Sequence, residues 1–475
     1  MRYQYLVQTS AASLKHIPAT QRVCSSKSSY SIKMSAGDQL VIGVITLIVA
    51  IFVGYFLYVA RGTPKNEQEQ EERNESGTKK KKSSQPAAPS KKKLAKDKEP
   101  AGAGSKLPSH SWQAGTLKGH TAEVSKLDFS LNGKFLISVA QDRTALISLT
   151  KDFLISDHKQ IRVNLGLDFA DNVFWSPDSK AFLISKYSES TLAVHKLGKK
   201  SDGSIGNISQ LFELPNAHSV NEIIGVSIAS SGKFMLSASR NGEIKTWDLK
   251  GIVLSDYIAP IKPLNCIKLS SCGRFVGFCG HSPQVHIWSV HYSKSGSYDS
   301  LLPSYILEGH DKEIFSLDFN TDATIIVTAD KAGTWRLFDA TGTKTTLRFS
   351  SSIKVDNPEN MIVAISHDSR VSAVAVDTRV ELFSAKSGQH LQTVETHYEE
   401  PLNDIKFSID DLYFVTAAAM DRTIKIFHNV CGYTEKVKDL KQQAKSADIG
   451  ANLKERFNQE ADAVEASLKK LKIMK

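Results

Sequence analysis

The chain has 475 residues, 41% of them hydrophobic, and a formal net charge of +10. This length allows several small domains or one large repeat fold, and the composition is ordinary for a globular protein. The positive charge by itself suggests nucleic-acid binding, but it is confined to two segments, with a net +4 in residues 1–38 and +6 in residues 61–106. Residues 107–475 are neutral overall, which argues against a broadly basic globular domain.

The residues that carry chemistry are also informative. Five cysteines occur, an odd number with no C-x-x-C pair, which argues against a disulfide framework or a structural zinc site. No nucleophile elbow, P-loop, HExxH motif or carboxylate constellation is present. We therefore predict a protein without catalytic activity, cofactor or metal.

The first 33 residues form a basic extension that contains no acidic residue and many serines. This composition is typical of an organelle transit peptide. A second methionine, Met34, offers another start, from which a short head leads directly into an apolar stretch. From Met34, residues 1–33 would be an upstream extension of little function; if they are retained, we predict a disordered basic extension over residues 1–33.

Residues 40–60 read LVIGVITLIVAIFVGYFLYVA and contain no charge. A helix of this length rises about 30 Å, enough to cross a bilayer, so we predict a transmembrane helix. A buried soluble helix or a cleaved signal segment is the alternative. Basic residues follow the stretch, which predicts that the C-terminal part faces the cytosol, although the five positive charges of residues 1–33 weaken this prediction if they are retained.

Residues 61–107 are poor in apolar residues and rich in Pro, Gly, Ser and Lys, which predicts a disordered linker. A basic segment beside a membrane attracts anionic headgroups by about 1 kcal/mol per residue. Binding to RNA or to the ribosome is the alternative role of the basic clusters, which consist of Lys79, Lys80, Lys81, Lys82, Lys91, Lys92 and Lys93.

From about residue 108 the pattern changes to short alternating apolar runs, which indicate strands. A block made of a small polar residue, a turn and a strand occurs seven times, at intervals of 41 to 53 residues. Such a period, with four strands per unit, is typical of a propeller blade. The blocks begin at Ser130, Ser176, Ala229, Ser270, Asn320, Ser366 and Ser408.

With the flanking Gly-His pairs and the Trp-Asp-like strand ends, these repeats resemble the WD40 family over roughly residues 112–430. The resemblance implies an all-β, seven-bladed WD40 β-propeller, placed here at residues 108–430. The strand-end residues are Trp247, Asp248, Trp288, Phe338, Asp339 and Phe427.

In this family a histidine and an acidic turn residue are hydrogen-bonded within one blade. By resemblance, His120 pairs with Asp142, and His397 pairs with Asp421. Asn241 takes the acidic position opposite His218. In the fifth repeat Ala332 stands where the acid is expected, so His310 is predicted to lack its partner. All these positions are interpreted as structural.

The family also closes its ring with a strand from before the first repeat, and Trp112–Leu117 is the candidate. After the last repeat, residues 434–473 carry apolar residues at heptad-like intervals, which predicts an amphipathic helix, divided or kinked at Gly450. This helix either packs on the propeller or self-associates as a coiled coil.

The complete layout resembles the transducin beta-like, membrane-anchored members of the WD40 family. That resemblance implies a single-pass endoplasmic-reticulum protein whose cytosolic propeller is a scaffold for cytosolic or membrane proteins. The alternatives are a ubiquitin-ligase substrate receptor, a GTPase exchange factor, and an RNA- or ribosome-associated protein. The first is considered because Trp247–Lys250 approaches a WDxR motif, although it ends in lysine. N-x-S sequons at Asn74 and Asn207, the latter expected in an exposed loop, would report the topology.

Overall fold

The computed structural model describes residues 110–200, 205–219, 222–341, 344–355, 358, 360–446 and 450–470. The predictions for residues 1–33, 40–60 and 61–107 lie outside this range, as do the seven linker lysines. Within the described part of the chain, no helix has the length and apolar character needed to span a bilayer.

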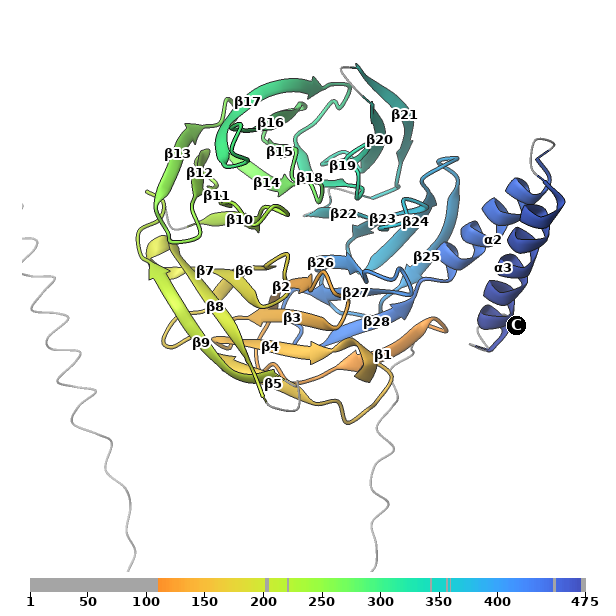
Figure 1. Ribbon diagram of the computed structural model, residues 1–475, viewed down its shortest axis with the longest axis horizontal. Helices are drawn as coiled ribbons and strands as arrows, with labels where there is room; N and C mark the ends of the chain where they lie inside the picture. Colours follow the sequence, from red (N-terminus) through yellow and green to blue (C-terminus); the bar gives the residue numbers. More distant parts are fainter. Residues whose placement is uncertain are drawn as a thin grey trace, which may run out of the picture. The chain divides into compact units, whose positions relative to one another are not determined.

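Seven four-stranded antiparallel sheets are arranged radially as the blades of a closed ring (Figure 1). Blades one to three consist of β2 (Val124–Phe129), β3 (Phe135–Ala140), β4 (Thr144–Leu149) and β5 (Gln160–Asn164); β6 (Ala170–Trp175), β7 (Ala181–Lys186), β8 (Thr191–Lys199) and β9 (Ile205–Leu214); and β10 (Ile223–Ile228), β11 (Met235–Ser239), β12 (Glu243–Trp247) and β13 (Val253–Ile258).

Blades four to six consist of β14 (Leu264–Leu269), β15 (Phe275–Gly280), β16 (Val285–Tyr292) and β17 (Tyr298–Leu307); β18 (Ile314–Phe319), β19 (Ile325–Asp330), β20 (Thr334–Thr341) and β21 (Lys344–Ser352); and β22 (Met361–Ile365), β23 (Val371–Val376), β24 (Arg379–Ser384) and β25 (His390–Glu395). Blade seven combines β26 (Leu402–Phe407), β27 (Tyr413–Ala418) and β28 (Ile424–His428) with β1 (Gln113–Leu117). Two single-turn helices, η1 (Thr150–Asp152) and η2 (Ser188–Ser190), lie in loops.

The seven-bladed propeller predicted from the sequence is confirmed, and the repeated block has a local cause. In each blade the block begins at the turn between the first and second strands. The first side chain of the turn bonds back to the backbone, as when Ser130 Oγ accepts the Phe135 N–H at 3.0 Å. Ser176, Ser270, Ser366 and Ser408 repeat this bond, while Asn320 uses its amide oxygen instead. In the third blade Ala229 has no such group, and backbone hydrogen bonds to Phe234 and from Gly232 hold the turn.

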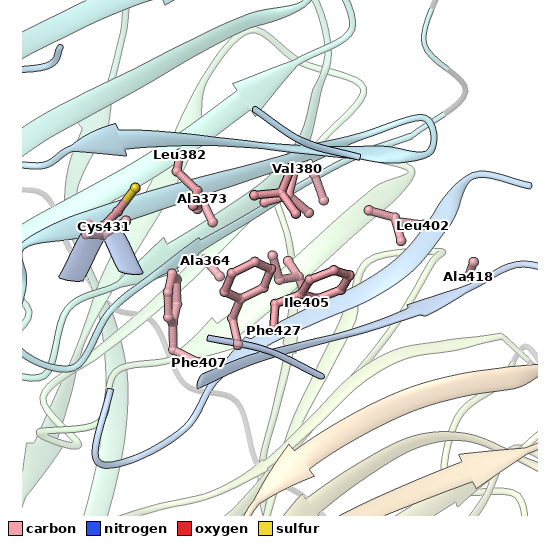
Figure 2. Packing of buried hydrophobic residues seen from close by; sticks show 14 of the residues in the cluster. Ala364, Ala373, Val380, Leu382, Leu402, Ile405, Phe407, Ala418, Phe427 and Cys431 are labelled. Atoms are coloured by element: carbon pink, nitrogen blue, oxygen red, sulfur yellow. The ribbon is translucent and has the colours of Figure 1, made fainter. Parts of the chain in front are cut away.

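The hydrophobic core is divided among the seven contacts between neighbouring blades. Each contact contains one cluster of buried side chains drawn from the two blades that face each other. Figure 2 shows the contact of blades six and seven, where Val380 and Leu382 face Ile405, Phe407 and Phe427. Because a single blade buries neither face alone, closing the ring is what completes the core.

Strand β1 closes the ring, as the sequence predicts. It pairs antiparallel with β28, with Gln113 opposite Phe427 and Leu117 opposite Ile424. A bulge next to Gly115 lets the backbone pass close to the Phe153 carbonyl, where a Cβ atom would lie 2.3 Å from that oxygen. The last blade is thereby built from both ends of the repeat region.

The helical region predicted for residues 434–473, divided or kinked at Gly450, consists of two helices, α2 (Val430–Ala444) and α3 (Ala451–Lys470). Helix α2 begins immediately after β28, capped by the Asn429 side chain, which accepts the Gly432 N–H at 2.9 Å. It packs on blade six, where Asp439 forms ion pairs with Arg370 and Lys386. Of the two predicted roles, packing on the propeller is the one present for α2, while α3 packs against α2 around Val437, Leu440 and Ala461.

Candidate binding site

The predicted histidine in blade one lies in a buried hydrogen-bonded chain. His120 Nδ1 is 3.1 Å from Asp142 Oδ2, and His120 Nε2 is 2.8 Å from Ser138 Oγ on β3. Burial lowers the pKa of His120, although Asp142 opposes the shift. These hydrogen bonds fix the loop that leads into blade one, so His120 has a structural role.

Blade three uses a different acid from the one predicted. His218 Nδ1 lies 3.3 Å from Glu243 Oε2, while Asn241 donates its amide to Glu243 and to Ser219 instead of facing the imidazole. The assignment of Asn241 as the partner of His218 is therefore wrong. The carboxylate comes from the first residue of β12, because the longer glutamate side chain reaches back to the loop.

The same blade contains the most complete network. Trp247 Nε1–H donates to Ser237 Oγ at 2.8 Å, and Ser237 Oγ is 2.8 Å from His218 Nε2. Burial, followed by the nearby Lys245, lowers the pKa of His218 to about 4, so this ring is neutral at pH 7. The tryptophan at the strand end thus stabilises the entry loop.

Blade five also differs from the prediction. His310 has an acidic partner, because its Nδ1 is 2.8 Å from Asp330 Oδ2, and its Nε2 is 2.7 Å from Thr328 Oγ1. Asp330 ends β19, two residues before the position of Ala332. An acid two positions earlier, at the end of β19, supplies the interaction that the sequence spacing seemed to exclude.

In blade seven the predicted pair of His397 and Asp421 does not form. The buried position belongs to Tyr398, whose hydroxyl donates to the Thr416 carbonyl at 2.7 Å and accepts the Lys425 N–H at 3.0 Å. His397 is half-buried at φ 53°, and Asp421 accepts from Thr423. The assignment of His397 is wrong by one residue, since Tyr398, like His120 and His310, stands four residues before its inner strand.

The remaining strand-end residues support the blades or their turns. Trp288, Phe338 and Phe427 are buried in the contacts between blades. Asp248 accepts the backbone N–H groups of Lys250 and Ile252, and Asp339 pairs with Arg348. The sequence-predicted residues are therefore distributed around the ring and do not converge on one site.

Residues from all seven blades do meet around one cavity of about 220 Å³. It lies at the end of the ring where the repeated turns are found. Every inner strand contributes its last residues to the lining, so the cavity occupies the mouth of the central channel. Aromatic side chains supply much of the wall, namely Phe129, Phe174, Trp175, Phe319 and Phe407. We call this cavity the channel-mouth pocket.

Four charged side chains line the channel-mouth pocket: Asp128, Lys268, Asp318 and Lys406. The two aspartates also link neighbouring blades. Asp128 Oδ2 accepts the Trp175 N–H at 2.7 Å, and Asp318 Oδ2 accepts the Ile365 N–H at 3.1 Å. One oxygen of each carboxylate is therefore committed to holding the ring together.

The two lysines have weaker partners. The shortest distance from Lys406 Nζ to a carboxylate oxygen is 4.0 Å, to Asp128. Within the described part of the chain, no carboxylate oxygen lies within 4.0 Å of Lys268 Nζ. Burial and the adjacent Lys268 lower the pKa of Lys406, whereas Asp318, Cys266 and Asp404 outweigh burial and raise the pKa of Lys268.

The sequence analysis did not identify this pocket, although a signal is present in the repeats. In four blades a charged residue and an apolar residue come immediately before the repeated turn residue. The four triplets are Asp128–Phe129–Ser130, Lys268–Leu269–Ser270, Asp318–Phe319–Asn320 and Lys406–Phe407–Ser408. Charges at the end of an inner strand face the channel in a propeller, so this recurrence indicates a charged channel mouth.

Comparison with known sequences agrees with this architecture. The family model "WD domain, G-beta repeat" matches residues 111–147, 209–248, 301–339 and 388–428. Each match combines the outer strand of one blade with the first three strands of the next, and together they identify blades one, three, five and seven. These are the blades with a histidine or tyrosine in the entry loop. The chain belongs to the WD40-repeat family.

Within that family, the chain is similar to transducin beta-like protein 2. The Mus musculus protein is 32% identical over 371 residues, which cover 77% of this chain and 83% of the mouse protein. The Homo sapiens protein is 31% identical over 372 residues, or 77% of this chain and 82% of the human one. Ribosome biogenesis protein YTM1 of Debaryomyces hansenii is 25% identical over 198 residues, 40% of this chain and 39% of that protein.

Proposed function

We propose that this protein is a membrane-tethered scaffold whose propeller recruits cytosolic proteins to the surface of the endoplasmic reticulum. The observation that carries the scaffold role is the closed seven-bladed WD40 ring, with a pocket at the mouth of its central channel. The tether is supported by the uncharged residues 40–60 and the lysine-rich segment that follows them. Similarity to transducin beta-like protein 2 over most of the chain supports the same layout.

The topology is tested by glycosylation of Asn207. This residue is exposed on β9, the outer strand of blade two, and not in the loop expected from the sequence; Ser209 completes the sequon. For a cytosolic propeller, we expect no change in mobility after endoglycosidase treatment of the cell-expressed full chain, and digestion of the ring by protease added to intact microsomes. A secreted form with a cleavable signal in place of residues 1–60 is the control that shows whether the sequon is accepted.

A mobility shift that disappears with Asn207→Gln would place the propeller in the lumen and contradict the proposal. Co-fractionation with a plasma-membrane or mitochondrial marker, and not with reticulum markers, would contradict the organelle alone.

A second candidate function is association with ribosomes. It is favoured by the local similarity to ribosome biogenesis protein YTM1 and by the lysine clusters at Lys79–Lys82 and Lys91–Lys93. Binding through these clusters would depend steeply on salt, because phosphate contacts release counterions. Sedimentation of the full chain with ribosomes at two salt concentrations, with the seven lysines intact or changed to glutamine, tests this role. Co-sedimentation that survives the change would exclude the linker as the contact.

A further inference from the structure

The channel-mouth pocket combines a charged floor with an aromatic wall, and its two lysines lack a close acceptor. Asp128 and Asp318 each use one oxygen to accept a backbone N–H from the next blade. Lys268 and Lys406 have no acceptor within ordinary hydrogen-bonding distance among the described carboxylates. An ammonium group has three donors and no acceptor, so two adjacent lysines are suited to an anionic oxygen group.

We propose that the channel-mouth pocket binds an acidic peptide segment of a partner protein, with a carboxylate between Lys268 and Lys406 and an adjacent apolar side chain against Phe129, Phe319 and Phe407. This inference rests on the proposed scaffold function, because it names the chemistry of the segment that the scaffold recruits.

The electrostatics of the pocket favour an anion over a cation. Burial, and then the neighbouring Lys268, lower the pKa of Lys406. A carboxylate placed between the two lysines offsets this repulsion and acts to raise the pKa of Lys406 again. A cationic ligand would have to compete with both lysines for the second oxygen of each aspartate, because the first oxygen already accepts a backbone N–H from the next blade.

The size and position of the pocket favour a peptide. A cavity of about 220 Å³ takes one or two side chains and not a folded domain. Its rim is formed by the turns of the blades, where Leu131 is 57% exposed. A segment of extended chain can therefore enter from the surface and place its acidic residue at the floor, while the apolar wall buries the neighbouring side chain.

Four fluorescein-labelled peptides test the proposal, with the full-length chain in phosphatidylcholine nanodiscs. Three are C-terminal amides of sequence Gly-Ser-Leu-X-Phe, in which X is Glu, Gln or Lys. The fourth has Gln at X and a free C-terminal carboxylate. We expect the Glu peptide, the free-carboxylate peptide or both to bind at least about tenfold more tightly than the Gln amide, the size expected for a charge-assisted contact. Comparing the Glu peptide with the free-carboxylate peptide also shows whether a side-chain or a terminal carboxylate is preferred.

Lysine variants assign the binding to the pocket. Lys268→Met and Lys406→Met keep most of the apolar stem and remove the charge, so each is expected to abolish the preference for the carboxylate. Lys233→Met is the matched control, because Lys233 is an exposed lysine in the repeated turn of blade three and does not line the pocket. Thermal melting followed by circular dichroism shows whether each variant is folded. If a variant is unfolded, the four peptides measured on the unaltered chain decide whether the proposal holds.

Equal or tighter binding of the Gln or Lys amide would overturn the proposal. So would a carboxylate preference that survives both lysine changes, or the absence of binding by every peptide up to about 1 mM. The peptide measurement does not depend on which side of a membrane the propeller faces. Failure here is therefore distinguishable from failure of the topology test.

Discussion

At the level of single residues, the blades maintain one interaction with different side chains. A histidine meets an acid from three different positions, namely Asp142 in a turn, Glu243 at the start of β12 and Asp330 at the end of β19. In blade seven a tyrosine replaces the histidine. What blades one, three, five and seven share is a buried polar side chain in the entry loop that bonds to the second strand. The family's residue pattern is one way to form this bond, and this chain uses several.

Tyr398→Phe tests the residue that blade seven uses. The change removes a buried hydroxyl that bonds to the Thr416 carbonyl and to the Lys425 N–H, leaving both groups unpaired. We expect a loss of about 1–3 kcal/mol in the free energy of unfolding, measured by urea denaturation. His397→Asn is the matched control, since asparagine accepts the positive φ of this position, and it should cost little. A larger loss for His397→Asn than for Tyr398→Phe would contradict the assignment.

His195 predicts a specific pH dependence. Burial, followed by the nearby Lys186, lowers the pKa of His195 to about 4, and its ring stacks on Phe182 without a hydrogen-bond partner for Nε2. Between the ordinary pKa of about 6.5 and this lowered value, the unfolded chain binds the proton and the folded chain does not. Stability from the neutral ring is complete above pH 6.5 and is lost as the pH falls toward 4.

Replacing His195 by leucine should flatten this dependence. We expect the slope of unfolding free energy against pH to decrease by up to about 1.4 kcal/mol per pH unit between pH 6 and 4.5. Urea denaturation at several pH values measures the slope. The nearby Glu213 does not obscure the effect, because the bond from Lys186 lowers its pKa below the ordinary value. An unchanged slope in the leucine variant would show that His195 is not the group that titrates.

At the level of elements, the sequence predicts the periodic features and only one of the predicted side-chain pairs, that of His120 with Asp142. Seven blocks with one turn chemistry specify seven blades, and the position of Trp112–Leu117 before the first block predicts the closing strand. Single side-chain partners were assigned by spacing, and spacing fails where a longer side chain such as Glu243 reaches across a turn. The division into α2 and α3 was anticipated at Gly450, yet the docking of α2 depends on Arg370 and Lys386 of blade six, far away in the sequence.

The pocket was missed for a related reason. Lys268 and Lys406 are 138 residues apart in the sequence (406 − 268). Only closure of the ring brings their inner strands to the same channel. The charged triplets show that four inner strands end next to a charged residue. They do not show which of these charges become neighbours, because the neighbours depend on the number of blades and on where the ring closes.

Ring closure by β1 predicts an outcome for truncation. Deleting residues 108–118 removes the strand that pairs with β28 and exposes the cluster shared by blades seven and one. We expect this deletion to broaden thermal unfolding and lower its midpoint, measured by calorimetry, because an open ring leaves one contact unformed. The control removes residues 447–475, a longer piece that includes α3 but no strand. A deletion of 108–118 that melts as cooperatively as the intact chain would refute closure by β1.

At the level of the whole molecule, charge is separated from the fold. The net +6 of residues 61–106 contrasts with a neutral remainder after residue 107, so attraction to an anionic surface is assigned to the linker and not to the ring. Such attraction falls off within a Debye length and weakens with salt. The linker is therefore expected to hold the neutral ring near a membrane without binding the ring itself to lipid.

A peptide of residues 61–107 tests this expectation with vesicles that contain or lack phosphatidylserine. We expect binding only to the anionic vesicles, and changing the seven lysines at 79–82 and 91–93 to glutamine should weaken it by at least about tenfold, since each lysine near the surface contributes about 1 kcal/mol. The matched control changes Glu67, Glu69, Glu71 and Glu72 to glutamine, which should strengthen binding because it raises the net charge. Co-sedimentation at two salt concentrations measures both effects. Equal binding to neutral vesicles would mean that headgroup charge does not hold the linker, and the tether would then consist of residues 40–60 alone.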